Sequence, residues 1–260
     1  MKTAPWSYEA FKREFCARTG LDLECYKDGQ MERRIRQFMS RSGSAGFSEF
    51  LELLQRDHEV MKQFQGYLTI NTSSFFRDGA VFSLIETEII PDLFARNRRI
   101  KAWSAPCSTG EEPYSLAIIL DRQGFLARTQ LVASDIDSRA LAHARRGEYG
   151  EHAVASLPRQ VLESYFTASG ENFLVRDRIR QAVTFKTCDL LKEVERDNHL
   201  VLCRNFLIYL KRRAQEQTIS RLVTNLKTGG FLVVGSAENI GNYRQWGLER
   251  LHHSVYRLKP

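Results

Sequence analysis

The chain has 260 residues, 43% of them hydrophobic and 27% charged, and its formal net charge is +7. A chain of this length can bury a full core, and this composition argues against a disordered protein. No apolar run approaches the roughly 20 residues that a membrane-spanning helix needs. Because the first residues also lack the apolar core of a signal peptide, we expect a cytoplasmic protein without membrane insertion.

Cysteines and histidines give no sign of a disulfide framework or a metal site. The five cysteines are scattered and form no Cys-x-x-Cys pair, which predicts reduced thiols. His252 and His253 are adjacent in an expected terminal strand, where they would point to opposite faces. We therefore expect no metal. The positive net charge allows a polyanionic partner, either nucleic acid or an acidic protein surface, and does not choose between them.

The first 75 residues carry a helical pattern. Tyr8, Phe11 and Phe15 fall at helical spacing, later aromatic and aliphatic residues repeat it, and no strand pattern appears. We therefore expect residues 1 to 75 to form a small all-helical domain.

One segment of this domain, residues 31 to 41, predicts a helix with two different faces. Met31, Ile35 and Phe38 share one side of a helical wheel, and four arginines lie on the opposite arc, namely Arg33, Arg34, Arg36 and Arg41. Residues 1 to 75 hold 11 Lys and Arg against 10 Asp and Glu, so the positive charge is local to this helix. A solvated helix face is the simpler interpretation, and a surface for an acidic partner is the alternative.

A polar stretch, residues 67 to 78, breaks the helical pattern and ends in Phe75-Phe76-Arg77-Asp78. The pattern resumes over residues 81 to 95 and leads into a buried strand. We place the boundary between the helical domain and a second domain, residues 76 to 260, near residue 75.

The second domain opens with a strand at 100 to 104, a turn of small residues at 105 to 110, and a helix with Pro113 in its first turn. Free amides at a helix start usually favour phosphate. Here a single glycine is followed by Glu111 and Glu112, which would repel an anion and suit a cation. The alternative is that both acids merely stabilise the helix N-terminus.

Strands and helices then alternate, which predicts an α/β fold with a doubly wound, mostly parallel sheet. Asp135 ends the second strand, at the position where such sheets hydrogen-bond a ribose diol. Both Asp135 and Asp137 precede an expected helix from about Ser138 to Arg146, so helix capping is the competing interpretation. We assign ribose binding to Asp135 and capping to Asp137 or Ser138.

Residues 165 to 182 depart from the alternation and predict a small β excursion. A strand near 183 to 186 leads to Asp189, and a strand at 199 to 203 delivers residues 204 to 209 to the carboxyl edge of the sheet, where open sheets bind ligands. A helix from about 211 to 225, a Gly229-Gly230 turn, a strand at 231 to 235 and a last strand near 254 to 258 complete the expected domain.

Four segments in this order resemble the CheR family, the chemotaxis receptor methyltransferases: residues 71 to 77, 103 to 115, 133 to 137 and 203 to 209. The resemblance covers nearly the whole chain. It implies S-adenosylmethionine as cofactor and receptor glutamates as methyl acceptors, on the cytoplasmic helical domain of a chemoreceptor. The sulfonium and ammonium of that cofactor suit a turn followed by carboxylates. We expect a monomer that binds no nucleic acid.

The resemblance also implies roles for single residues. Two positions depart from the usual family pattern. Ser73 occupies a position where the family often has Thr, and Asp189 one where it often has Asn; both residues keep hydrogen-bonding capacity. The implied cofactor contacts are Asn71, Ser73, Arg77, Glu111, Asp135, Asp189, Leu190, Asn205 and Phe206.

Methyl transfer to a carboxylate requires little acid–base catalysis, because the carboxylate is already ionised near neutral pH. We expect Tyr209 and Arg204 near the transfer point and Arg33, Arg34 and Arg36 to contact the receptor. A structural salt bridge for Arg204 and aromatic packing for Tyr209 are the alternatives. An RNA methyltransferase or a non-catalytic S-adenosylmethionine sensor are the alternative functions.

Overall fold

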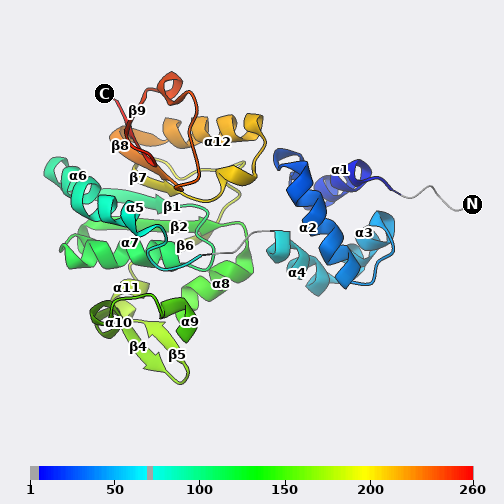
Figure 1. Cartoon of the computed structure of the whole chain (residues 1–260), viewed down its shortest axis with the longest axis horizontal. Coiled ribbons are helices and arrows are strands. Elements are labelled where there is room, and N and C mark those ends of the chain that lie inside the picture. Colours follow the sequence, from blue (N-terminus) through cyan, green and yellow to red (C-terminus); the bar gives the residue numbers. More distant parts are fainter. Residues whose placement is uncertain (1–5, 69–72, 260) are drawn as a thin grey trace, which may run out of the picture. The chain divides into compact units, whose positions relative to one another are not determined.

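The computed structural model describes residues 6 to 68 and 73 to 259. The chain divides into two compact units (Figure 1). The N-terminal unit contains the first four helices and also the segment Tyr209–Gln215, whereas the sheet unit contains the remaining residues from 72 onward. The sequence-based boundary near residue 75 had left Tyr209–Gln215 in the second domain.

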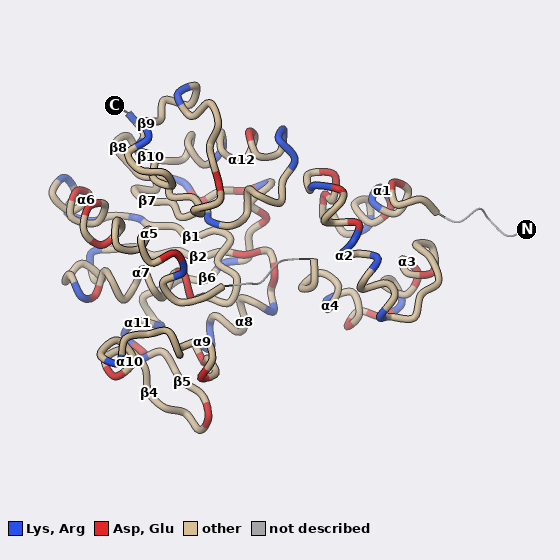
Figure 2. The backbone as a smooth tube through the Cα atoms, in the orientation of Figure 1, with Lys and Arg blue, Asp and Glu red and all other residues tan. Residues whose placement is uncertain are grey.

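The described residues before residue 69 form four helices of the N-terminal unit: α1 (Tyr8–Thr19), α2 (Asp28–Arg41), α3 (Phe47–Arg56) and α4 (His58–Leu68), with a short 3₁₀ turn η1 (Leu23–Cys25) after α1. Its core is aromatic, and the Phe50 and Phe64 rings meet edge to face with centroids 4.9 Å apart. Met31 and Ile35 of α2 are buried in this core, as their spacing predicted. Figure 2 shows both basic (blue) and acidic (red) residues on the helices of this unit.

The segment Tyr209–Gln215 joins this unit through its backbone. Tyr26 and Leu210 form an antiparallel bridge, the Lys27 amide donates to the Tyr209 carbonyl (2.9 Å), and the Lys211 amide donates to the Cys25 carbonyl (2.8 Å). These three contacts make a short two-stranded pairing, which explains why the segment groups with the helices.

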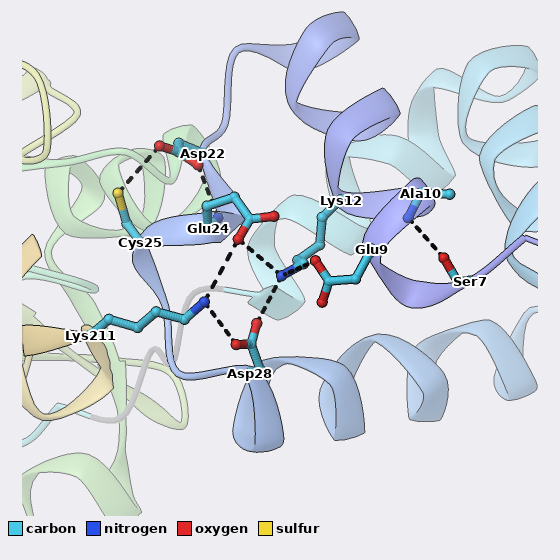
Figure 3. Close-up of polar contacts among 9 residues, drawn as sticks. All are labelled: Ser7, Glu9, Ala10, Lys12, Asp22, Glu24, Cys25, Asp28 and Lys211. Carbon is cyan, nitrogen blue, oxygen red and sulfur yellow. Dashed lines mark hydrogen bonds and ion pairs between the residues drawn. The ribbon is translucent and has the colours of Figure 1, made fainter.

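Two lysines and two acids strengthen this pairing (Figure 3). Lys12 is almost fully buried, and its Nζ lies 2.9 Å from Asp28 Oδ1 and 3.1 Å from Glu24 Oε2. Lys211 Nζ lies 2.7 Å from the other Asp28 oxygen. Asp28 therefore joins two cations from different parts of the chain, and together they lower the pKa of its carboxyl, Lys211 most strongly.

The sheet unit contains a seven-stranded sheet in the order β6-β2-β1-β7-β8-β10-β9. The first five strands in this order pair in parallel and β10 is antiparallel to both neighbours. This confirms the α/β class with a doubly wound, mostly parallel sheet. The strands are β1 (Ile100–Ser104), β2 (Thr129–Asp135), β6 (Val183–Thr187), β7 (Asn198–Cys203), β8 (Leu226–Val234), β9 (Leu248–His252) and β10 (Val255–Leu258).

Helices connect these strands. α7 (Glu111–Arg122) and α8 (Ser138–Arg146) both pack against β2 and β6, and α12 (Arg212–Thr224) leads into β8. The expected helix over 81 to 95 is α5 (Gly79–Leu84) and α6 (Ile90–Arg96) joined by a π-helical turn, η2 (Ile85–Ile89). α7 is buried over its first ten residues, because it lies against the sheet along most of its length.

A small three-stranded sheet, in the order β3-β5-β4, forms the β excursion. The hairpin of β4 (Phe166–Ser169) and β5 (Asn172–Val175) lies within the expected range, whereas β3 (Glu148–Gly150) comes from outside it. Short helices accompany this sheet: α9 (Glu151–Val154), α10 (Arg159–Tyr165) and α11 (Asp177–Arg180).

The Gly229-Gly230 turn expected from the sequence is wrong, because both glycines lie inside β8. A Cβ on Gly230 would stand 2.7 Å from the Lys227 carbonyl oxygen and 3.0 Å from that of His199. Glycine is therefore needed here for close backbone approach at an irregularity of the β7–β8 pairing, not for a reversal of the chain. The sequence pattern also gave no sign of β9, the antiparallel partner of β10.

Candidate functional site

The carboxyl ends of β2, β1, β7 and β8 lie side by side in the sheet, so the loops that follow them gather at one edge. Ser104 is in register with Ala133 on one side and Leu202 on the other, and Cys203 pairs with Val234. Open parallel sheets bind ligands at this edge. We call it the catalytic edge.

The turn after β1 is held tightly in place. The Cys107 amide donates to the Ser134 carbonyl (2.8 Å), and the Tyr149 hydroxyl, from β3, donates to the Thr109 carbonyl (2.7 Å). Gly110 has a φ of +97°, and a Cβ there would lie 2.8 Å from the Ala144 Cβ. Only glycine satisfies both this conformation and this contact.

Asp135 at the end of β2 is buried, with 4% of its surface exposed. Its Oδ2 accepts the Ser108 amide (2.7 Å), and its Oδ1 accepts the Asp137 amide (2.9 Å). Burial raises the pKa of the Asp135 carboxyl, and these amide bonds oppose the rise. The carboxylate therefore links the two loops after β1 and β2. Asp137 accepts the amides of Arg139 and Ala140, which confirms it as the N-cap of α8.

Glu111 and Glu112 open α7, and both are buried. The Thr109 hydroxyl donates to Glu111 Oε2 (2.7 Å), whereas the Ser104 hydroxyl donates to Glu112 Oε1 (2.8 Å). The two carboxylates thus face different partners, one in the turn and one on β1.

Arg204, directly after β7, is the ion-pair partner of Glu112. Its Nη1 lies 3.0 Å from Glu112 Oε2, and its Nη2 lies 2.9 Å from Asp78 Oδ2 and 2.6 Å from the Arg77 carbonyl oxygen. The Arg204 side chain is 1% exposed. These contacts favour the salt-bridge interpretation, with Arg204 holding the segment before α5 against the catalytic edge.

The polar segment Ser73–Asp78 is fixed by its neighbours in the sheet unit. The Phe76 amide donates to the Ser115 hydroxyl (2.8 Å), and the Phe75 ring meets the Tyr149 ring edge to face at 4.9 Å. Phe76 and Asp78 adopt positive φ values of 50° and 59°. Ser73 and Arg77 belong to this segment, whereas Asn71 lies outside the described residues.

The loop after β6 carries Asp189 and Leu190. The Cys188 amide donates to the Asp135 carbonyl (3.0 Å), so this loop continues the pairing of β6 with β2. Leu190 is buried, and the Asp189 carboxylate accepts the Leu191 amide (3.0 Å).

Glu238 is a residue of the catalytic edge that sequence reasoning missed. It is 2% exposed, and its Oε2 accepts the amides of Asn205 (2.8 Å) and Gly235 (2.6 Å). Its other oxygen accepts the Ile208 amide at 3.3 Å. One carboxylate therefore ties together the loops that follow β7 and β8, and it positions Asn205 and Phe206. The signal available in the sequence was only an acid soon after a buried strand.

Tyr209 and the arginines of α2 lie in the N-terminal unit. Arg34 donates to the Tyr67 carbonyl and stacks on the Tyr67 ring at 4.6 Å, so it helps to hold the end of α4. Arg36 pairs with Glu32 (2.7 Å) and lies over the Phe47 ring, while Arg33 is exposed. The four arginines expected on one open face therefore have different surroundings.

The charge of the catalytic edge fits a cationic ligand. Its buried carboxylates are Glu111, Glu112, Asp135, Asp137 and Glu238, and Arg204 is the one buried guanidinium among the described residues. An excess of buried acid lowers the electrostatic cost of placing a sulfonium and an ammonium there. The residues present therefore fit S-adenosylmethionine.

The described residues contain neither a metal-binding cluster nor a membrane-spanning helix. No group of three or more His, Cys, Asp or Glu side chains is arranged to hold a metal ion there. No helix in the described ranges combines the length and the hydropathy needed to cross a membrane.

Comparison with known proteins gives matches along both units. Residues 7–69 match the family model described as the CheR methyltransferase all-alpha domain, and residues 71–253 match the CheR methyltransferase SAM binding domain. A chemotaxis protein methyltransferase of Listeria innocua is 35% identical over 96% of this chain and 96% of its own. Chemotaxis protein methyltransferase 1 of Pseudomonas aeruginosa is 31% identical, covering 93% of each chain.

Proposed function

The chain belongs to the CheR methyltransferase family, a family of S-adenosylmethionine-dependent methyltransferases, and we propose that it methylates glutamate side chains on the cytoplasmic helical domain of a chemoreceptor. The observation that carries the proposal is the catalytic edge, where buried carboxylates surround the loops after β1, β2, β7 and β8 in a chain that matches chemotaxis methyltransferases along 96% of its length. The proposed setting is the cytoplasm.

Bound S-adenosylmethionine supplies an electrophilic methyl group on a sulfonium, and an ionised glutamate needs no base to attack it. This chain therefore has to bind the cofactor, to orient its methyl group toward the glutamate carboxylate, and to exclude water. In the proposal Glu111 faces the amino-acid end, Asp135 the ribose, and Asp189 and Leu190 flank the adenine. Asn205 and Phe206, held by Glu238, close the pocket, and Ser73, Arg77 and Asn71 contact the cofactor from the segment before α5.

Arg204 takes a different part in this proposal from the one expected at first. Its contacts with Glu112, Asp78 and the Arg77 carbonyl make it a positioning residue that holds Arg77. Tyr209 remains the proposed group that orients the incoming carboxylate, at the end of the loop that Glu238 fixes.

For receptor recognition we propose Arg33 and Arg36, the two residues of the expected trio that are exposed. Arg34 supports them by fixing Tyr67. Replacing Arg33 and Arg36 with Glu is expected to slow receptor methylation and to weaken its salt dependence, with cofactor affinity unchanged. Methylation rates at several ionic strengths, beside calorimetry with S-adenosylmethionine, measure both effects.

The function itself is tested by incubating the protein with methyl-labelled S-adenosylmethionine and either receptor cytoplasmic fragments or total RNA. Label in the receptor that is released by mild base, as a methyl ester is, supports the proposal. Label in RNA identifies an RNA methyltransferase, and cofactor binding without label in either substrate identifies a sensor.

A matched variant connects the site to this activity. Asp135→Ala is expected to weaken S-adenosylmethionine binding by about 1 to 3 kcal/mol, the range for losing a charged hydrogen-bonding group. Asp121→Ala, at the far end of α7 beside Arg178, is the control. Equal affinities in the Asp135 variant and the parent protein would remove Asp135 from the site.

A further inference from the structure

A basic depression lies at the edge of the sheet opposite the catalytic edge. It has a volume of about 480 Å³ and is bordered by residues at the starts of β1, β2, β7 and β8 and by the two residues just before β7. A second hollow of about 500 Å³ shares part of this lining and extends it along residues 224 to 228. The charged side chains of the basic depression are Arg99, Lys101, Arg128, Arg196, Asp197 and Lys227.

Five of these six side chains are cationic, and two of the five are held in place. Lys101 Nζ lies 2.8 Å from Glu195 Oε2, and Arg128 donates to the Arg98 carbonyl (2.7 Å). The other three, Arg99, Arg196 and Lys227, are exposed and have no acid within ion-pair distance in the described part of the chain. The basic depression therefore has more positive charge than its neighbours balance.

The charge of the whole chain points to the same unit. Of 38 Lys and Arg, 11 lie in residues 1 to 75, together with 10 of the 31 Asp and Glu. The surplus of positive charge therefore lies almost wholly in residues 76 to 260, although methyl transfer at an acidic site does not require it. Receptor recognition by α2 does not account for it either.

The size and chemistry of the basic depression select a ligand class. Its volume lies in the usual range for small-molecule sites, and guanidinium groups match phosphate oxygens in paired hydrogen bonds. No Phe, Tyr or Trp is among the described residues that line it, so it offers no such ring for stacking a nucleobase. We propose that the basic depression binds a phosphate-bearing anion, either free in solution or carried by a lipid headgroup.

His199 at the start of β7 also lines the basic depression, so its pKa can report anion binding there. Its Nδ1 accepts the Lys101 amide (3.0 Å), which leaves Nε2 to carry the proton of the neutral ring. Burial lowers the pKa of His199, Lys227 and Arg96 lower it further, and Asp197 opposes them. A bound anion adds negative potential, so it should raise the pKa of His199.

The test uses the full-length protein and sodium tripolyphosphate as probe, with calorimetry at low ionic strength. We expect binding that weakens as salt is added, and at least a tenfold loss of affinity in the variant Arg99→Ser, Arg196→Ser, Lys227→Ser. In parallel, NMR should show the His199 pKa rising when tripolyphosphate is added. Loss of affinity in the variant without change in S-adenosylmethionine binding would assign the anion to this edge.

A control variant removes the same number of charges elsewhere. Arg56→Ser, Arg159→Ser, Arg244→Ser changes three exposed residues outside the basic depression, and we expect it to retain tripolyphosphate affinity within about twofold. Equal losses in both triple variants would mean general charge attraction and would overturn the proposal.

Vesicles distinguish the sources of phosphate. Cosedimentation with phosphatidylglycerol vesicles but not with phosphatidylcholine vesicles, abolished in the triple variant Arg99→Ser, Arg196→Ser, Lys227→Ser, identifies a lipid headgroup. Tripolyphosphate binding without cosedimentation identifies a free anion. No binding of either probe, or binding of RNA through these residues with none of tripolyphosphate, would overturn the proposal.

Discussion

The guanidinium of Arg204 lies 3.0 Å from the carboxylate of Glu112, and together they form a buried ion pair between the end of β7 and the start of α7. Removing one member of such a pair leaves an uncompensated buried charge, which usually costs about 3 to 5 kcal/mol of unfolding free energy. We expect this loss for Arg204→Gln, measured by urea unfolding followed through tryptophan fluorescence, to which the buried Trp103 contributes.

The stability of the same variant relative to the parent protein should depend on pH. Burial raises the pKa of Glu112 and Arg204 lowers it, so removing Arg204 raises it further. An acid whose pKa is higher in the folded state destabilises that state as pH rises above the unfolded value. The gap in stability between Arg204→Gln and the parent should therefore narrow as pH falls toward the ordinary pKa of glutamate. A gap that is constant from neutral to acidic pH would contradict this account.

Gly110 provides a prediction about the turn after β1. Gly110→Ala introduces both a positive φ for a non-glycine residue and a Cβ 2.8 Å from the Ala144 Cβ. Gly124→Ala is the control, because its φ is +75° and nothing lies within 4 Å of its Cβ position. We expect about 1 to 2 kcal/mol of destabilisation for Gly124→Ala and at least 2 kcal/mol more for Gly110→Ala. Equal losses would show that the turn can move away from α8.

Glu238 should control the cofactor pocket through the Asn205 loop. Glu238→Ala removes the acceptor for the Asn205, Gly235 and Ile208 amides, and we expect at least tenfold weaker S-adenosylmethionine binding, about 1.4 kcal/mol. Glu171→Ala, at the exposed hairpin turn between β4 and β5, is the control. Calorimetry measures the S-adenosylmethionine affinity of both variants. Unchanged binding in Glu238→Ala would show that the Asn205 loop keeps its position without this carboxylate.

Asp28 is expected to titrate differently without Lys211. The pKa of Asp28 is lowered, first by Lys211 and then by Lys12, so its contribution to stability is present above the unfolded pKa and lost as pH falls through the folded pKa. In Lys211→Met the Asp28 pKa, followed by carboxyl NMR, should move up toward its ordinary value. Lys62→Met, which removes the exposed partner of Glu59, should leave it in place.

The small β sheet leads to a prediction about the receptor tail. In some members of the family this part grips a peptide at the receptor C-terminus. Here β4 and β5 have four residues each and a short turn at Gly170 and Glu171. Such short loops favour methylation without a tether, that is, without binding of the receptor C-terminal peptide to this sheet. We expect similar methylation rates on one receptor fragment with and without its last few residues. A tenfold or larger drop on truncation, about 1.4 kcal/mol, would show a working tether.

Local patterns carried the sequence-based predictions that succeeded. The β1 strand, the α7 start and the Asp137 cap each depend on neighbours within a few residues, which the sequence displays directly. Glu238 and Arg204 depend on partners 33 and 92 positions away, Asn205 and Glu112. Sequence spacing holds no information on such pairings. The helical wheel of α2 failed for Arg34 for the same reason, since Tyr67 is 33 residues distant.

The bridge between Tyr26 and Leu210 decides how this protein can be recombined with its relatives. Leu210 is fully buried, and its neighbours Tyr209 and Lys211 exchange backbone hydrogen bonds with Lys27 and Cys25. A chimaera joined near residue 70 would combine the helices of one parent with the 209 to 215 segment of another. Exchanging that segment together with the helices keeps the Asp28 and Lys211 charges matched. Compatible hybrids therefore require two further crossovers, one on each side of the segment, as well as the one near residue 70.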